Sequence, residues 1–347
     1  MALRTLGLVF GGRSGEHEVS VQSAASVWQA ADRDRYQLLP LAISKSGRFV
    51  GGLSPLDVME MGMVVPEPQQ GGVSPLAVFS EMDVVFPLLH GPYGEDGTIQ
   101  GMLEMLDIPY VGAGVLASAL AMDKAMAKQL FERLGFPQAP FRVFTRSQCL
   151  MRPAEVLRVV EERLGFPCFV KPANLGSSVG ITKVHIPDQL PQALALAGSF
   201  DRKIVVESFI DGREIECSVL GNDQPQASVP GEIIPAVEFY DYQAKYVRQD
   251  SQLLIPAPIT PKQMADVQRL AVQVFQAIDG SGLARVDFFI RNGDGAVLVN
   301  EINTMPGFTS ISMYPKLWEA SGLPYPRLID ELVNLAVERY NEKRGLG

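Results

Sequence analysis

The sequence predicts a protein of mixed α/β and α+β class, in which an N-terminal doubly wound parallel-sheet domain is followed by a two-part α+β module. Three observations lead to this prediction. The chain has 347 residues, enough for two or three domains. Apolar runs alternate with helical patterns in the first third, as in βαβ units. The remainder is rich in strand-like runs that are separated by turn residues.

The expected N-terminal domain, residues 1–112, contains four apolar runs that we interpret as strands. These runs are residues 5–10, 36–43, 83–89 and 108–111, and a helical pattern occupies residues 19–31. The alternation predicts a parallel sheet with helices on both faces. Residues 51–75 are rich in Gly, Pro and Met with weak periodicity, so we expect an insertion or mobile surface loop there.

The expected central domain, residues 113–207, begins with a long helix at 122–134 and continues as a small α+β unit. Between two of its strands, the small residues of 173–180 predict a flexible flap. The C-terminal domain, residues 208–347, is expected to be rich in strands and covered by two helices, at 262–278 and 327–343.

Composition excludes several classes of protein. The formal net charge of −9 argues against nucleic acid or an anionic membrane as the main partner. No segment approaches the roughly 18 consecutive apolar residues that a membrane-spanning helix needs. The first apolar run is short and reads as a strand rather than a signal peptide. The three cysteines lack CxxC spacing, so we expect reduced thiols in a cytoplasmic protein.

Two Gly-rich turns, residues 11–16 and 112–117, follow expected strands. A dinucleotide site would need an acid at the tip of the second strand, and neither turn has one at that place. Both matches are therefore weak, and a tight strand-to-helix turn is the alternative for each. Glu16, which closes the first turn, has two open interpretations. It could hold a substrate ammonium in the crevice of the sheet, or it could offset the helix dipole.

Two further polar positions follow apolar strands. His90 begins a Gly-rich loop at the carboxyl end of an expected parallel strand, where ligands bind in such sheets. Lys171 ends an otherwise apolar strand, so its ammonium needs an anion or the surface. The Gly/Ser loop that follows it could wrap phosphate oxygens, although it is not a P-loop.

The strongest pattern is Arg285-Val286-Asp287 followed by Glu301-Ile302-Asn303. Within each strand the two polar residues face one side, and residues 292–295 indicate a hairpin between the strands. Asp287 then falls within one register step of Glu301, a difference that a β-bulge would correct. Two carboxylates and an amide form an oxygen site for Mg²⁺, and an Arg–Asp–Glu salt-bridge network is the alternative.

Taken together, these segments resemble the D-alanine–D-alanine ligases of the ATP-grasp superfamily. The resemblance covers nearly the whole chain apart from about residues 45–80. The matching stretches, in the family's order, are GGRSGEHEVS (11–20), HGPYGEDGTIQG (90–101), MDK (122–124), VKPANLGSSVG (170–180), EFYDYQAKY (238–246), ARVDFF (284–289) and NEINTMPGFTSIS (300–312).

The resemblance implies a role for each matching residue. For ATP it implies phosphate contacts from Lys124 and Lys171, a flap that contains Ser178, adenine contacts from Glu207 and Ile210, and a ribose contact from Glu214. For metal it implies two Mg²⁺ or Mn²⁺ ions on Asp287, Glu301 and Asn303. For the reaction it implies Arg285 at the oxyanion and a hydrogen-bonded set made of Glu16, Ser177 and Tyr246. For the amino-acid substrates it implies His90, Lys245, Gly307 and Ser312.

The resemblance also implies an activity. It is the ATP-dependent joining of two D-alanines through a D-alanyl phosphate, which supplies peptidoglycan synthesis, by a homodimer. Tyr246 resembles the residue of dipeptide-forming enzymes. The alternatives are a D-alanine–D-lactate ligase or another ATP-grasp carboxylate–amine ligase. Outside this class, the Gly-rich turns leave a dinucleotide-binding oxidoreductase or a nucleotide sensor without catalysis.

Overall fold

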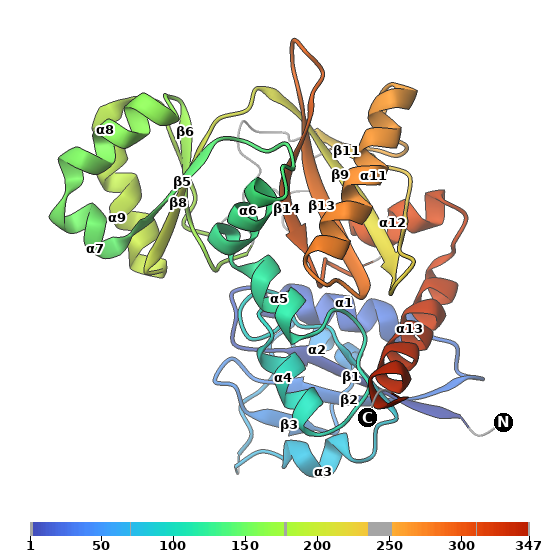
Figure 1. Ribbon diagram of the computed structural model, residues 1–347. Coiled ribbons are helices and arrows are strands. Elements are labelled where there is room, and N and C mark those ends of the chain that lie inside the picture. The colour runs from blue at the N-terminus through green and yellow to red at the C-terminus, as the bar shows by residue number, and fades with distance from the viewer. Residues whose placement is uncertain (1–2, 70, 177–178, 235–251, 310, 346–347) are drawn as a thin grey trace.

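Three sheets follow one another along the chain, each with helices of its own (Figure 1). A computed structural model describes residues 3–69, 71–176, 179–234, 252–309 and 311–345. In Figure 1 the N-terminal sheet lies at the bottom, the central sheet at the upper left and the C-terminal sheet at the upper right. This arrangement confirms the predicted fold class, a parallel sheet followed by antiparallel α+β units.

The N-terminal sheet has the strand order β3-β2-β1-β4, and β2, β1 and β4 are parallel. Its strands are β1 (Arg4–Gly11), β2 (Tyr36–Ile43), β3 (Phe49–Gly51) and β4 (Val84–Pro87). Its helices are α1 (His17–Ala30), α2 (Pro55–Glu60), α3 (Pro75–Phe79) and α4 (Thr98–Met105), and the next helix, α5 (Val115–Met122), packs on β14 (Val297–Asn303) of the C-terminal sheet. Alternation along β1 buries Leu6 and Leu8 toward α1 and Val9 toward α3 and α4, so both faces are covered. The carboxyl ends of β1 and β4 therefore open toward the other sheets.

The expectation of a loop at residues 51–75 is wrong for its first half. Ser54 and Asp57 form a reciprocal capping box that starts α2, a helix that packs on α1. Val58 is fully buried, and the Val65 N–H donates to His17 Nε2 at 3.1 Å. The weak apolar periodicity concealed a short helix because two buried residues, Pro55 and Val58, and one cap are enough to anchor it.

Two other boundaries also differ from the predictions. The fourth expected strand, residues 108–111, makes only a single bridge, between Tyr110 and Val85. The helix expected at 122–134 is α6 (Lys124–Arg133), and the separate helix α5, which ends at Met122 just before it, was not predicted. Asp123 has extended backbone angles, and its carboxylate accepts from Met126 N as the N-cap of α6. Such a cap stabilises a helix by about 1 kcal/mol, which favours a fresh start over continuation.

The central sheet is antiparallel with the order β5-β8-β6-β7. Its strands are β5 (Phe141–Thr145), β6 (Cys168–Pro172), β7 (Thr182–Val184) and β8 (Lys203–Ser208). The helices α7 (Arg146–Met151), α8 (Pro153–Arg163) and α9 (Leu190–Phe200) and the short 3-10 turn η1 (Pro187–Gln189) belong to this region. Val156 and Val160 of α8 pack with Val170 and Val206 on one face, while Ala125 of α6 packs with Val205 on the other. Helix α6 therefore lies between this sheet and the next.

The C-terminal sheet has the order β12-β11-β9-β13-β14, with β10 paired to β9. Its strands are β9 (Gly212–Gly221), β10 (Gln226–Ala227), β11 (Gly231–Ile234), β12 (Gln252–Leu254), β13 (Gly282–Arg291) and β14 (Val297–Asn303). Its helices are α11 (Pro261–Ala277), α12 (Met313–Ala320) and α13 (Tyr325–Gly345). Val267, Val274 and Phe275 of α11 cover one face. The predicted strands and both predicted helices are thus confirmed within the described residues.

Helix α13 returns to the N-terminal sheet (Figure 1). Its Leu328 and Leu332 are fully buried in the same core as Leu6 and Leu8 of β1. Arg339 adds a hydrogen bond to the Tyr110 carbonyl at 3.2 Å. Although α13 is the longest helix within the described ranges, neither it nor any other helix there is long and apolar enough to cross a membrane.

Candidate active site

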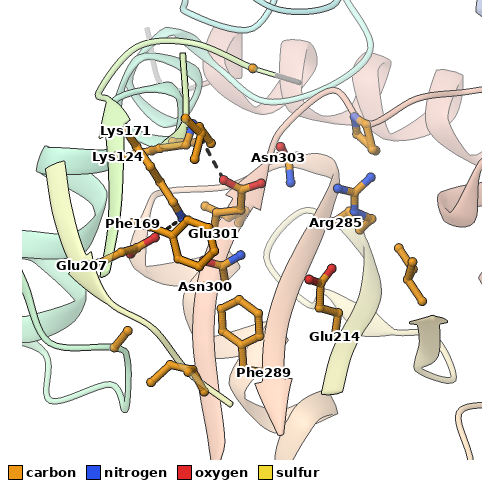
Figure 2. A pocket seen from close by; sticks show the side chains of 18 of the residues that line it. Lys124, Phe169, Lys171, Glu207, Glu214, Arg285, Phe289, Asn300, Glu301 and Asn303 are labelled. Carbon is orange, nitrogen blue, oxygen red and sulfur yellow. Dashed lines mark ion pairs between the residues drawn. The ribbon is translucent and has the colours of Figure 1, made fainter. Parts of the chain in front are cut away.

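A cavity of about 480 Å³ lies where the three sheets meet (Figure 2). The N-terminal loops contribute Glu16, the central sheet contributes Lys171, and β13 and β14 contribute Arg285, Glu301 and Asn303. Residues from all three predicted domains therefore surround one space.

The wall made by β13 and β14 has the geometry that the sequence predicts. Asp287 pairs directly with Glu301, and the register shifts between Asp287 and Phe288, which is the expected bulge. The Arg285 guanidinium donates to both oxygens of Asp287, at 2.7 and 2.8 Å, and lies 3.0 Å from Glu216. Asn303 Nδ2 also donates to Asp287, at 3.1 Å. The salt-bridge network considered as the alternative is therefore present as well.

The donor atoms of this wall suit a divalent cation. Glu301 and Asn303 line the cavity, and Asp287 lies directly across from Glu301, so carboxylate and amide oxygens converge on one face. Oxygen ligands of this kind are those that Mg²⁺ takes, with phosphates and waters completing the shell. No cluster of three His, Cys, Asp or Glu side chains with metal-binding geometry occurs in the described part of the chain, so the third donor would be the Asn303 amide.

Lysines from α6 and β6 face this wall. Lys124 Nζ lies 3.7 Å from Glu301 Oε2 and donates to the Leu175 carbonyl at 2.7 Å. Lys171 forms an ion pair with Glu207 (Figure 2). Burial, together with the nearby Lys128 charge, lowers the pKa of Lys171 to about 7. An anion entering the cavity would reverse this shift by favouring the charged form.

The sequence analysis did not identify Lys128, which is buried beneath this group. Its Nζ lies 2.8 Å from Glu207 Oε2. Lys124 and Lys128 are four residues apart, and this spacing places them on one face of a helix. The spacing from Lys124 could therefore have predicted a second lysine on the side of α6 that faces the site.

Apolar side chains line the part of the cavity next to Glu207. Phe169, Ile210, Phe289 and Ile302 all face it. Figure 2 shows Phe169 and Phe289 together with Glu214, a carboxylate from β9. A flat apolar ring would fit between such side chains, with polar groups at its edges.

The loops after β1 and β4 form the opposite wall. Glu16 is 7% exposed, and a Cβ on Gly91 or Gly176 would lie 2.5 or 2.8 Å from its Oε2, so a side chain at either position would displace this carboxylate. Glu95, which the sequence analysis did not single out, also lines the cavity and accepts from Gly91 N at 2.8 Å. Burial and the Glu16 carboxylate raise the pKa of Glu95 to about 8.

His90 lines the cavity, but both of its ring nitrogens are engaged. One contacts Ser23 Oγ at 2.9 Å and the other the Met305 carbonyl at 3.1 Å. Burial lowers the pKa of His90, which favours the neutral ring. Its contacts therefore fix the Gly-rich loop to α1 and to the segment after β14.

Of the remaining predicted positions, some lie at or beside the cavity and the others lie outside the described residues. Gly307 lines the cavity, and the Ser312 hydroxyl lies beside it and accepts from Thr309 N at 3.0 Å. Four of the predicted site residues lie outside the described residues: Ser177, Ser178, Lys245 and Tyr246.

Comparisons with known proteins agree with this geometry. Residues 5–113 match the family described as D-ala D-ala ligase N-terminus, and residues 130–334 match D-ala D-ala ligase C-terminus. The D-alanine–D-alanine ligase of Halothermothrix orenii is 50% identical over 97% of this chain and 99% of its own length.

Two solved structures share the fold over nearly the whole chain. One is the D-alanine-D-alanine ligase from Coxiella burnetii, with a TM-score of 0.84, 35% identity, and coverage of 100% of this chain and 97% of that one. The other is the VanG D-Ala:D-Ser ligase from Enterococcus faecalis, with a TM-score of 0.83, 33% identity, and coverage of 96% and 100%. The chain belongs to the D-alanine–D-alanine ligase family.

Proposed function

We propose that the cavity between the three sheets is the place where this chain joins two D-alanines with conversion of ATP to ADP and phosphate. One observation supports this most strongly. The same cavity holds lysines and a candidate metal wall on one side and the buried Glu16 carboxylate on the other. Phosphates and an amino-acid ammonium would thus bind within reach of each other, as a reaction between ATP and an amino acid requires.

ATP would lie across the central and C-terminal sheets. Its phosphates would meet Lys124 and Lys171, and its adenine would lie among the apolar side chains near Glu207 and Ile210. Glu214 would accept from the ribose hydroxyls. The flap residue Ser178 would cover the phosphates, which would exclude water from the reacting groups.

Asp287, Glu301 and Asn303 would hold two Mg²⁺ or Mn²⁺ ions. Bound there, the ions would neutralise charge on the transferring phosphoryl group. Arg285 donates to both Asp287 oxygens, and each oxygen keeps a second lone pair that could bind a cation. Arg285 would thus orient the Asp287 carboxylate beside the metal.

The reaction would proceed in two displacements. A carboxylate oxygen of the first D-alanine attacks the γ-phosphorus of ATP, so that ADP leaves and a D-alanyl phosphate forms. The amine of the second D-alanine attacks the acyl carbon, and phosphate leaves as the peptide bond forms. Arg285 stabilises the oxyanion that develops on the acyl oxygen. Water must stay out, because it would hydrolyse the acyl phosphate.

The amino acids would be held mainly by the loop wall, which is the side of the cavity formed by the loops after β1 and β4 and contains Glu16 and Glu95. Glu16 would bind the ammonium of the first D-alanine and join Ser177 and Tyr246 in one hydrogen-bonded set. The contact between Glu16 and Gly176, the neighbour of Ser177, supports such a link. The other substrate contacts would come from His90, Lys245, Gly307 and Ser312.

The same proposal covers organisation and setting. Domains at 1–112, 113–207 and 208–347 each contain one sheet, with the second boundary at the end of β8. A homodimer is consistent with apolar side chains exposed on α4 and α5, where Met105 is 90% and Leu116 is 64% exposed. The enzyme would act in the cytoplasm and supply the precursor of peptidoglycan.

A phosphate-release assay tests the function directly. We expect ATP- and Mg²⁺-dependent release with D-alanine alone, together with a dipeptide product visible by mass spectrometry. D-Lactate and D-serine, each added with D-alanine, test the second site. A depsipeptide or a D-alanyl-D-serine product formed in preference to the dipeptide would contradict the proposal.

A further inference from the structure

Lys128 is an ammonium group buried in the interior of the protein. The residue is 3% exposed and lies on α6, whose N-terminus also carries Lys124. Among the described residues, its Nζ forms an ion pair with Glu207 Oε2 at 2.8 Å, and the Glu301 carboxylate acts on it from farther away. The Nζ also lies 5.7 Å from the centre of the Phe141 ring. A buried lysine needs an anionic partner to remain charged.

Glu207 has a lysine on each of its two oxygens. Oε2 faces Lys128, and Oε1 forms the ion pair with Lys171 that Figure 2 shows. The Glu207 side chain is 4% exposed. One buried carboxylate is therefore shared by two ammonium groups.

The two lysines differ in what they can reach. Lys171 lines the main cavity and its side chain is 12% exposed. Lys128 does not line that cavity and borders only a minute void behind it. A ligand can therefore draw Lys171 away from Glu207, whereas Lys128 stays in place.

Drawing Lys171 away has an electrostatic consequence. If Lys171 were the sole partner of Glu207, its move to a phosphate would leave a buried carboxylate without a counter-ion, which is strongly unfavourable. We propose that Lys128 is a positioning residue that neutralises Glu207 so that Lys171 can exchange this carboxylate for a nucleotide phosphate. The inference rests on the proposed function, because it takes the cavity to be a nucleotide site.

The protonation of Lys128 is compatible with this role. Burial lowers the pKa of Lys128 to about 8, so most of the ammonium remains charged at neutral pH. The adenine contact assigned to Glu207 also requires an ionised, correctly turned carboxylate. The ion pair with Lys128 keeps Oε2 close to α6.

The experiment measures ADP affinity by calorimetry with Mg²⁺ present, and KM for D-alanine. The variants are Lys128→Met, Glu207→Gln and the double variant, with Lys262→Met of the exposed start of α11 as a matched control. We expect Lys128→Met to weaken ADP binding by about 10–100-fold, since it leaves Glu207 to hold Lys171. KM for D-alanine should stay within about twofold, because the loop wall is untouched.

The double variant separates positioning from general damage. With both buried charges removed, Lys171 is free, so ADP affinity should return to within about threefold of Glu207→Gln alone. If Lys128→Met is too unstable to assay, this comparison decides alone, since the double variant removes both members of the buried Lys128–Glu207 pair.

Three results would overturn the inference. They are unchanged ADP affinity in Lys128→Met, losses that add in the double variant, and a KM for D-alanine that rises as much as the ADP dissociation constant. Absence of ADP binding by the unmodified enzyme would instead overturn the proposed function itself.

Discussion

The two walls of the cavity are built in different ways. The strand wall is formed by β13 and β14, on which Asp287 and Glu301 are paired, so the ladder of backbone hydrogen bonds fixes their separation. Arg285 and Asn303 donate hydrogen bonds to Asp287. Glu16 and Glu95 stand on loops after β1 and β4, where two carboxylates approach each other. One wall combines opposite charges, and the other gathers like charges.

This difference indicates what each wall is suited to receive. The strand wall carries both signs of charge, so it can rearrange around a multiply charged ligand with little change in net charge. The loop wall brings two carboxyl groups together, and a bound cation such as an ammonium would favour the ionised form of Glu95. Substitutions in the two walls should therefore damage different steps.

The largest effect is expected from Glu301→Ala. Removing this carboxylate from the strand wall should lower Mg²⁺-dependent turnover by at least about a thousandfold, since a metal clamp contributes several kcal/mol. Mg²⁺ titration of phosphate release measures it. Asp294→Ala, an exposed acid of the neighbouring hairpin turn, is the control and should be nearly normal. Near-normal activity of Glu301→Ala at ordinary Mg²⁺ would remove the metal assignment.

Arg285→Met should lower kcat by about 10²–10³, as loss of one oxyanion donor does. The methionine retains much of the side-chain length without the charge. Steady-state kinetics with saturating D-alanine measures it, and Arg291→Met at the exposed end of β13 is the control. A change confined to the KM for ATP would place Arg285 in nucleotide binding instead.

Glu16→Gln, in the loop wall, should raise KM for the first D-alanine by about 10–100-fold and leave that for ATP nearly unchanged. A hydrogen bond to a charged group contributes roughly 1.5–3 kcal/mol, which sets this range. Glu18→Gln, whose carboxylate pairs with the half-exposed Lys45, is the control. If only the ATP constant rose, Glu16 would be a helix-start acid, and the contrast between the walls would fail.

The smallest effect concerns stability and pH. The pKa of Glu95 is raised from 4.5 to about 8 in the folded protein, so the folded state binds this proton more tightly than the unfolded chain. The stabilisation that comes from binding this proton is complete below the pKa that Glu95 has in the unfolded chain, and it is lost as pH rises through about 8. The melting temperature of Glu95→Gln, relative to the unmodified protein, should therefore increase between about pH 5 and pH 8. If the difference in melting temperature between the two proteins did not change with pH, burial would not raise the pKa of Glu95.

The strand wall could be read from the sequence because a period of two fixes which side chains share a face. The hairpin at residues 292–295 then set the register of Asp287 against Glu301 to within one step. The resemblance to a known family supplied the distant members, since nothing local relates Glu16 to Lys171.

The loop wall and the interior could not be read in this way. Glu95 and Lys128 matter because of burial and of neighbours from other elements, and neither property is written in a local pattern. The capped helix α2 was missed because its side-chain capping bonds outweighed the average composition around it, and helix α5 was missed because a Gly-rich turn directly precedes it.

The return of α13 to the N-terminal sheet has a consequence for the order of events during synthesis. Leu328 and Leu332, near the end of the chain, complete the hydrophobic core that Leu6 and Leu8 begin. The ribosome makes the chain from its N-terminus, so the first sheet emerges long before the helix that covers one of its faces. Until α13 has been made, the part of that face that α1 leaves uncovered exposes apolar surface. A chain truncated before α13 would therefore lose part of the core around its first sheet, at the opposite end of the sequence from the truncation.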